Sequence, residues 1–306
     1  MTSDDLTVAV PTYQRESVLV DTVDALASSG AAEILVVDQT LDHEPRTAAR
    51  LREHADEGRI RWLRLDQPSI PHAMNVALLE ARHPLVLFLD DDIEPGDGLI
   101  AAHAAGYEDP TTWAVVGQIL QPGETAGPVR GRFRTTGLRA FLDFPFSSSD
   151  PAWVTNVMAG NLSVRRERAL SVGGFDENFV GAAYRFETEF CRRLCGGGGR
   201  VRFQPRARIR HLRAPRGGTR VHGDHLTSPS SAHGVGDYYF ALRQGISLES
   251  IRYILSRPLR KVWARFYLRR PWWIPVGLIG ELRALLLALR LVRRGPRYVV
   301  LDPLSH

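Results

Sequence analysis

The run Leu85–Leu89 is entirely apolar and is followed at once by three carboxylates, Asp90, Asp91 and Asp92. Its length and composition are typical of a strand that is buried on both faces, as in a parallel sheet. The acids would then lie at the carboxyl end of that strand, which is where open α/β sheets bind ligands. The segment therefore predicts an α/β fold with a ligand site at this edge of the sheet.

Three neighbouring carboxylates repel one another, and a folded chain tolerates them best when a divalent cation that prefers oxygen ligands neutralises them. The alternative is an acidic turn in contact with water, because aspartate is also favoured where a helix begins. The segment alone leaves both interpretations open, a metal site and a turn that opens a helix.

Segments with strand-like and helix-like patterns alternate through the first 92 residues. Such repeated βα units predict a Rossmann-like, mostly parallel sheet with right-handed crossovers and flanking helices. Residues 1–92 are therefore interpreted as a nucleotide-binding half. The predicted strands are 6–11, 34–38, 60–65 and 85–89, and the predicted helices are 16–28 and 73–81.

The following part of the chain mixes its elements differently. Residues 121–151 are rich in Gly, Pro and Ser and show little periodicity, which is typical of a binding loop or lid. Around this segment the sequence predicts strands at 113–120 and 161–164, a helix at 184–194, and a final pair of strands within 201–211.

Two cysteines, Cys191 and Cys195, lie four residues apart in a predicted helix. A secreted disulfide framework needs more cysteines, so a reducing cytosol is the expected setting. The segment Met1–Asp5 also lacks the basic and apolar blocks of a signal peptide. We therefore expect a cytoplasmic protein.

The C-terminal part of the chain is strongly basic. The whole chain carries a net charge of +5, which favours an anionic partner such as nucleotide phosphate or acidic lipid. Residues 252–297 hold twelve basic side chains and one acid, Glu281. The apolar stretch Trp272–Val292 is interrupted by charged residues and Pro275, so it fits a surface-lying amphipathic helix better than a membrane span. Contact with an anionic membrane and docking on the protein's own core both remain open.

Five short motifs follow one another in order between residues 6 and 215. Together they resemble family 2 glycosyltransferases with a GT-A fold. The resemblance implies a catalytic domain at 1–215, whose acceptor half is 93–215, and leaves 216–306 as a mainly helical extension. The motifs are Val10–Tyr13, Val36–Asp38, Asp90–Asp92, Gly173–Glu177 and Phe186–Glu189.

This resemblance implies a site for a nucleoside diphosphate sugar. Asp38 is expected to bind the nucleobase, commonly uracil, above a floor formed by Pro11, Thr12 and Tyr13. The alternative for Asp38 is a helix cap or turn residue. A UDP-sugar is therefore the favoured donor.

Further donor contacts are implied at the metal strand and in the loop after residue 212. Asp90 and Asp91 are expected to face the sugar and the ribose, and Asn75 to contact the donor. Arg220 lies in a Gly- and Arg-rich loop suited to folding over a diphosphate. Many relatives have arginine where this chain has Met74, which puts donor identity and affinity in doubt.

A divalent cation, Mg²⁺ or Mn²⁺, is expected between the donor's two phosphates. The resemblance implies Asp92 as its ligand, with Asp90 and His211 as further ligands. Negative charge grows on the leaving oxygen when the bond to diphosphate breaks, and a bound cation stabilises it as a Lewis acid. No general acid is then required.

The acceptor hydroxyl must lose its proton to a base. By resemblance this base is Glu187, at the start of a helix after the Gly173–Glu177 turn, with Glu189 as the fallback. A single displacement with inversion is the implied reaction. Asn161 matches a polar position near the acceptor, with plain backbone bonding as the alternative.

The sequence therefore predicts a metal-dependent, inverting glycosyltransferase of cell-envelope polysaccharide or glycolipid synthesis. Its acceptor would be a lipid-linked sugar or polysaccharide at the inner face of the cell membrane. A sugar nucleotidyltransferase is disfavoured, because the loop after the first strand has no glycine. A non-catalytic protein that binds membrane or nucleic acid is the other alternative, although no recognisable nucleic-acid module occurs.

Overall fold

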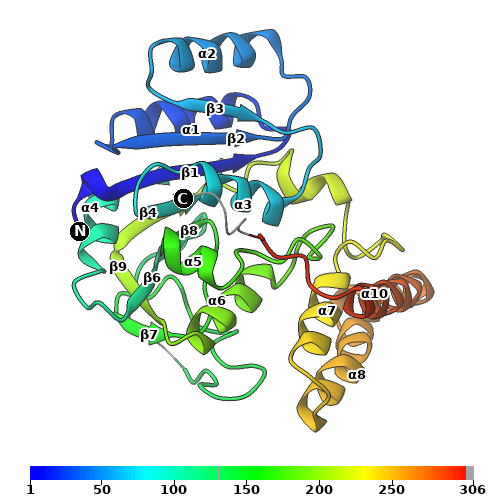
Figure 1. Ribbon diagram of the computed structural model, residues 1–306. Helices are drawn as coiled ribbons and strands as arrows, with labels where there is room; N and C mark the ends of the chain where they lie inside the picture. Colours follow the sequence, from blue (N-terminus) through cyan, green and yellow to red (C-terminus); the bar gives the residue numbers. More distant parts are fainter. Residues whose placement is uncertain (130, 301–306) are drawn as a thin grey trace.

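The computed structural model describes residues 1–129 and 131–300. Within them a nine-stranded sheet lies at the centre, in the order β3-β2-β1-β4-β8-β6-β9-β5, with β7 paired to β9 (Figure 1). The first half of this sheet is parallel throughout. Its strands are β1 (Leu6–Thr12), β2 (Glu33–Asp38), β3 (Arg61–Arg64) and β4 (Leu85–Leu89).

The second half of the sheet mixes directions. β8 runs antiparallel between β4 and β6, whereas β9 is parallel to β6 and antiparallel to β5 and β7. The predicted pair of strands within 201–211 is wrong, because one long strand, with a register shift opposite Gly117, occupies that segment. The strands are β5 (Ile93–Pro95), β6 (Thr112–Leu120), β7 (Ala152–Val154), β8 (Asn161–Arg165) and β9 (Arg200–His211).

The apolar run of β4 is buried on both faces of the sheet. Val86 and Phe88 belong to one hydrophobic cluster, and Leu85, Leu87 and Leu89 belong to the other. This alternation is what a pleated strand between two helical layers requires. The α/β prediction is confirmed, and the acids follow directly where β4 ends.

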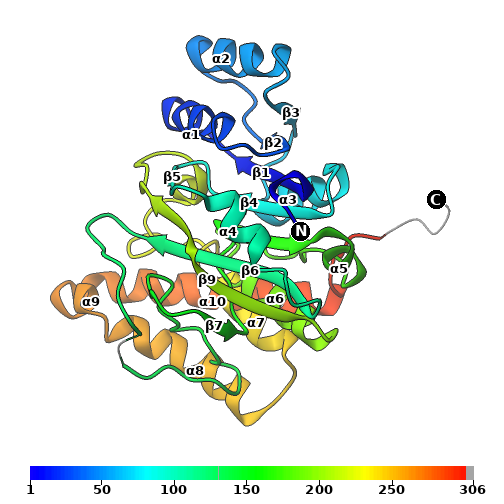
Figure 2. The same ribbon diagram turned by 90° about the vertical axis from the view of Figure 1, so that its left-hand side faces the viewer.

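Helices cover both faces of the sheet (Figures 1 and 2). α1 buries Leu19, Val23 and Leu26, three to four residues apart, against one of them. The described residues between β6 and β7 form a long loop, as predicted. The helices of this part are η1 (Ser3–Asp5), α1 (Ser17–Ala27), α2 (Pro45–Asp56), α3 (Ile70–Glu80), α4 (Leu99–Ala105), α5 (Arg166–Ser171) and α6 (Phe186–Gly196).

The C-terminal helices form a layer beside α6 (Figure 1). Tyr239, Phe240, Ala284 and Ala288 are fully buried and belong to the same hydrophobic cluster as the sheet. Docking on the protein's own core is therefore confirmed for one side of this layer. Its helices are α7 (Val235–Arg243), α8 (Leu248–Val262), α9 (Arg265–Arg269), η3 (Pro271–Trp273) and α10 (Ile274–Arg294). The short helix η2 (Gly218–His222) lies apart from them, beside the end of β1, where the Gly218 amide donates to the Tyr13 carbonyl.

Candidate active site

A cavity of about 470 Å³ lies at the carboxyl ends of β1 and β4. Its wall includes Pro11, Thr12 and Tyr13 from the end of β1, all three predicted as the floor of the donor site. The segment 179–184 before α6, Phe186 and Glu187 at the start of α6, and η2 with Arg220 line it as well. The cavity therefore lies at the sheet edge where the sequence predicted a ligand site.

The three carboxylates after β4 have different surroundings. The Asp90 side chain is half exposed within the cavity wall, at 51% of its full accessibility. Asp91 is buried, and each of its oxygens has a protein donor: Thr12 Oγ1 at 2.7 Å and Arg15 Nε at 3.0 Å. Each Asp91 oxygen thus already has one protein donor, and a ribose hydroxyl would share an oxygen with Thr12 or Arg15.

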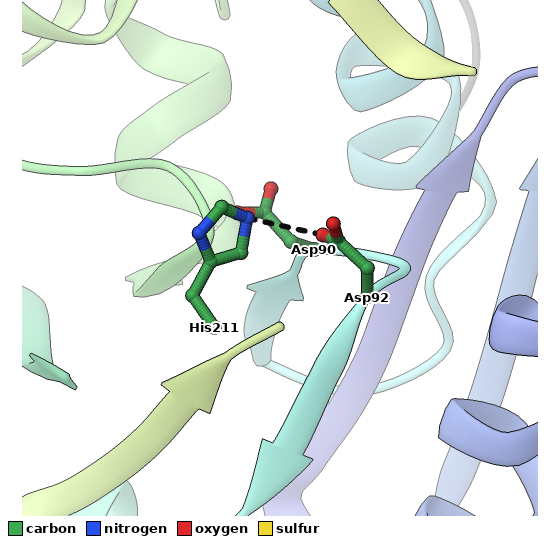
Figure 3. A group of neighbouring side chains, drawn as sticks. All are labelled: Asp90, Asp92 and His211. Carbon is green, nitrogen blue, oxygen red and sulfur yellow. Dashed lines mark ion pairs between the residues drawn. The ribbon is translucent and has the colours of Figure 1, made fainter. Parts of the chain in front are cut away.

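Asp90, Asp92 and His211 come together as a possible metal centre (Figure 3). His211 Nε2 lies 3.1 Å from Asp92 Oδ1 and 3.9 Å from Asp90 Oδ2. One ligand atom from each residue lies within 4.8 Å of the others. Carboxylate oxygens suit Mg²⁺ and Mn²⁺, and the imidazole nitrogen favours the transition metal of the two. These residue types fit the predicted cation.

Neighbouring groups orient two of these side chains, Asp92 and His211. Asp92 Oδ2 accepts hydrogen bonds from the Ala214 amide at 2.8 Å and from Arg15 Nη2 at 3.2 Å, which leaves Oδ1 for a cation. His211 Nδ1 lies 3.1 Å from Gln121 Oε1, so a proton on Nδ1 leaves the Nε2 lone pair for the metal. Burial opposes ionisation of Asp92, but His211 and Arg15 outweigh it and lower the pKa of this carboxyl.

Glu187, the predicted base, lines the same cavity from the first turn of α6. Burial is the main reason that its pKa rises to about 7, and the negative charge of Asp90 adds to the rise. Its own backbone N–H and Arg185 act in the opposite direction. A carboxyl group that titrates near neutral pH is well matched to take a proton from a hydroxyl.

Glu189, the predicted fallback base, does not line the cavity. It is 3% exposed and is held by Arg193, with Nε to Oε1 at 2.7 Å and Nη2 to Oε2 at 2.8 Å. Two residues along a helix turn a side chain by about 200°, so Glu187 and Glu189 point in nearly opposite directions. The structure assigns Glu189 a contact within the core.

Replacing Glu189 by glutamine is expected to lower the free energy of unfolding by about 3 kcal/mol, because it leaves Arg193 as a partly buried charge without its partner. Sugar transfer at a temperature where the variant is folded should stay within about twofold of the unchanged protein. Thermal unfolding and initial rates check this. A large loss of turnover in a folded Glu189→Gln variant would instead make Glu189 the base.

Asp38, predicted to bind the nucleobase, is fully buried behind the cavity wall. Its oxygens accept hydrogen bonds from the Thr40 amide at 2.8 Å and Trp62 Nε1 at 2.9 Å, and Nε2 of His43 lies at 2.8 Å. The bond to the Thr40 amide, two residues further on, is the one expected of a turn residue, which was the alternative for Asp38. Gln39, the next residue, lines the cavity in its place.

Two asparagines predicted near the donor and the acceptor also bond to the protein itself. Asn75 accepts from the Phe175 amide at 2.8 Å and donates to the Phe175 carbonyl at 2.9 Å, so it holds the turn before α6. Asn161 donates to the Ala207 carbonyl at 2.8 Å and to the Gln118 carbonyl at 3.1 Å. Neither side chain lines the cavity.

Comparison with known proteins shows the family to which this chain belongs. The model of glycosyl transferase family 2 matches residues 7–171 of the 306, which is more than half of the chain. The chain belongs to this family. The matched segment contains the sheet strands β1 to β8 and the three carboxylates.

A relative of this family 2 glycosyltransferase is also named a glycosyltransferase. The pre-mycofactocin glycosyltransferase of Mycobacterium tuberculosis is 28% identical over 142 residues, which are 45% of this chain and 29% of the relative. The chain therefore aligns with less than a third of that protein's length.

Solved structures share the fold. The mannosyltransferase PcManGT from Pyrobaculum calidifontis, in complex with GDP-Man and Mn²⁺, has a TM-score of 0.55 and 21% identity over 95% of this chain and 79% of its own. Residues 1–349 of TarS from S. aureus, in complex with UDP-GlcNAc, have a TM-score of 0.57 and 15% identity over 100% of this chain and 95% of that one. These likenesses confirm the predicted GT-A fold.

Arg15 is the site residue of this glycosyltransferase that the sequence did not reveal. Its side chain is 6% exposed and bonds to Asp91, Asp92 and the carbonyl of Ala214. It thereby joins the loop after β1, the acids after β4 and the loop after β9. A buried arginine is rare unless it is paired. Its place two residues after the Val10–Tyr13 motif was the available signal.

Proposed function

We propose that this protein transfers a sugar from a nucleoside diphosphate sugar to a hydroxyl acceptor with inversion at the anomeric carbon. The observation that carries the proposal is a single cavity lined by both a possible metal centre and a carboxyl group that titrates near neutral pH. Residues 1–215 would be the catalytic domain, and 216–306 a helical extension. The favoured context is synthesis of a cell-envelope polysaccharide or glycolipid.

Asp90, Asp92 and His211 would hold Mg²⁺ or Mn²⁺ beside the donor diphosphate. When bound, the cation supplies Lewis-acid stabilisation of the charge that grows on the leaving oxygen. Arg15 and the Ala214 amide hold Asp92 Oδ2, which leaves Oδ1 for the cation. Arg220, in η2 at the cavity wall, would contact the same diphosphate.

Glu187 would remove the proton of the acceptor hydroxyl as its oxygen attacks the anomeric carbon. The nucleoside diphosphate would leave from the opposite face of the sugar as the bond from its oxygen to the anomeric carbon breaks, so one such displacement inverts the configuration. Holding both reactants in one cavity converts an encounter between two molecules into a reaction of aligned groups. Glu187 needs only to be ionised and within hydrogen-bond reach of that hydroxyl.

A UDP-sugar is the first donor to test, and a GDP-sugar the second. TarS is in complex with UDP-GlcNAc and PcManGT with GDP-Man, so both nucleotides occur among proteins of this fold. Asp38 does not line the cavity, and Gln39, which does, already bonds to the Ser69 amide and the Thr12 carbonyl, so the base is left to the donor screen.

A screen of nucleotide sugars tests the proposal. Release of nucleoside diphosphate without acceptor would be followed by chromatography for UDP- and GDP-sugars, with Mn²⁺ or with EDTA. We expect slow hydrolysis of one donor with Mn²⁺ and a loss of at least about tenfold with EDTA. Hydrolysis at equal rates with EDTA would contradict the metal-dependent mechanism.

We further propose that the C-terminal helices bind an anionic membrane surface, as at the inner face of the cell membrane. None of the helices in the described part of the chain has the length and apolar character to cross a bilayer. However, Trp263, Trp272, Leu259 and Leu282 are 58–72% exposed on α8, η3 and α10 or directly beside them. Exposed arginines accompany them. Interfacial helices combine such apolar and basic side chains.

Sedimentation with vesicles tests membrane binding. The protein is expected to pellet with vesicles that contain phosphatidylglycerol and much less with vesicles of phosphatidylcholine alone. A Trp263→Glu, Trp272→Glu double variant should lose most of this binding. Leu41→Glu, which changes a 62% exposed apolar residue between β2 and α2, is the matched control and should bind unchanged. Equal binding by all three proteins would contradict the proposed surface.

A further inference from the structure

A second cavity, of about 510 Å³, lies where the C-terminal helices meet the segment before α6. Side chains of α7, α8 and α10 line it, together with Tyr184 and Arg185. Tyr184 also lines the first cavity, so one aromatic side chain is common to both walls. Glu187, three residues after Tyr184, lines the first cavity. The second cavity therefore adjoins the proposed base.

Positive charge predominates in the wall of this second cavity. Four cationic and two acidic side chains line it, an excess of two positive charges, and two histidines are added to these. The cations are Arg185, Arg257, Arg260 and Lys261, the acids are Asp237 and Glu281, and the histidines are His225 and His233.

Both acids are already satisfied by protein donors. Asp237 Oδ1 accepts from Arg185 Nε at 3.1 Å and from the Tyr253 hydroxyl at 2.6 Å, and its other oxygen pairs with Arg257. With less than a tenth of its side chain exposed, Asp237 contributes to the structure of the wall more than to its surface. Glu281, the second acid, is likewise bonded within the wall.

Glu281 on α10 is 5% exposed and joins α7 and α8 to its own helix. Its Oε2 accepts from Arg257 Nε and the Tyr238 hydroxyl, each at 2.8 Å, and its Oε1 accepts from Lys261 Nζ at 3.2 Å. Because Arg257 and Lys261 pair with Glu281, the other two cations of the wall, Arg185 and Arg260, are the ones to consider for a ligand.

Two arginines keep donors for a ligand. Arg260 is exposed, and its guanidinium lies 5.6 Å from the Tyr253 ring centre. This side chain has no ion pair or hydrogen bond with any residue that the structure describes. The Arg185 side chain hydrogen bonds through its Nε alone among the described residues, and its guanidinium lies 4.6 Å from the Tyr184 ring centre, so its two terminal nitrogens remain for other partners. Its backbone φ of 75° is left-handed, which costs free energy in a residue other than glycine and must be maintained by its surroundings.

We propose that this second cavity binds an oxyanion carried by the acceptor, a phosphate or a carboxylate, while the acceptor hydroxyl reaches Glu187 past Tyr184. The inference rests on the proposed function, since it places the acceptor of that reaction. Forked guanidinium groups bind the oxygens of phosphates and carboxylates in pairs. The half-exposed Tyr184 ring, between the two cavities, offers a flat apolar face for a sugar ring.

Three probes with the same sugar ring test this inference in calorimetric titrations. They are glucose 6-phosphate, glucuronate and methyl glucoside, added to the full chain with UDP and Mg²⁺ present to fill the donor site. We expect at least one charged probe to bind at least about tenfold more tightly than neutral methyl glucoside. Which of the two binds distinguishes phosphate from carboxylate. Equal affinities for all three would overturn the inference.

The variant Arg260→Gln assigns the binding to this cavity. It should lower the affinity for the charged probe at least about tenfold. Arg252→Gln, which changes an exposed arginine of the same helix outside the cavity wall, should leave that affinity unchanged. Hydrolysis of the donor without acceptor is measured in parallel and should be equal in both variants, so a failure of the donor site would be seen separately. Undiminished probe binding in Arg260→Gln would overturn the inference.

Discussion

Replacing Asp92 by asparagine is expected to reduce sugar transfer at least about 100-fold. The Asp92 carboxylate uses Oδ2 for Ala214 and Arg15 and leaves Oδ1 beside His211. An asparagine has one oxygen, which these two donors would claim, so its NH₂ group would point at the cation. Initial rates of transfer with saturating Mn²⁺ measure the effect.

Glu94→Gln is the matched control, because it removes an exposed carboxylate two residues further along the chain. Glu94 lies 3.8 Å from Arg210 and is not part of the metal centre or the cavity wall. Its rate should stay within about twofold of the unchanged protein. Circular dichroism would show that Asp92→Asn is folded. A folded Asp92→Asn variant with full activity would remove the metal centre from the mechanism.

Replacing Glu187 by glutamine should lower kcat about 10²- to 10⁴-fold, because the acceptor hydroxyl loses its base. The pH dependence gives a second test. With a pKa raised to about 7, Glu187 is protonated and inactive as a base below that pH, so the rate of the unchanged protein should fall as the pH drops through 7. This acidic limb should be absent from the residual activity of the variant.

Glu189→Gln is the control for this pH profile. It removes a carboxylate of the same helix turn that is directed into the core, and its acidic limb should stay near pH 7. A limb near pH 7 that persists in Glu187→Gln would show that another group is the base.

Local patterns were sufficient to predict β1 to β4, β6 and β8 and to place the acid triplet at the end of β4, but they did not predict the short strands β5 and β7. The run Leu85–Leu89 carries its own signal, since five successive apolar residues need two buried faces. Glu187 and Glu189 show what a motif alone does not predict, because two acids two residues apart point in nearly opposite directions on a helix. Asp38 and Gln39 differ in the same way at the end of a strand, where successive side chains alternate.

Contacts between distant segments could not be predicted in this way. Arg15 donates hydrogen bonds to Asp91 and Asp92, which follow it by more than seventy residues. A single sequence contains no periodic pattern that would indicate such a pairing. The second cavity likewise forms only when α7, α8 and α10 pack beside Tyr184. The C-terminal helices could pack on the core or bind a membrane, and the structure confirms the first for their buried side while the second stays a prediction.

Calorimetric titration of UDP and GDP into the unchanged protein, with Mn²⁺ and then with EDTA, tests the central claim most directly. The claim is that Asp90, Asp92 and His211 bind a cation that holds the donor diphosphate. It predicts that Mn²⁺ tightens binding of one nucleotide at least about tenfold, and that this gain is lost in Asp92→Asn. Equal nucleotide affinity with Mn²⁺ and with EDTA would contradict it.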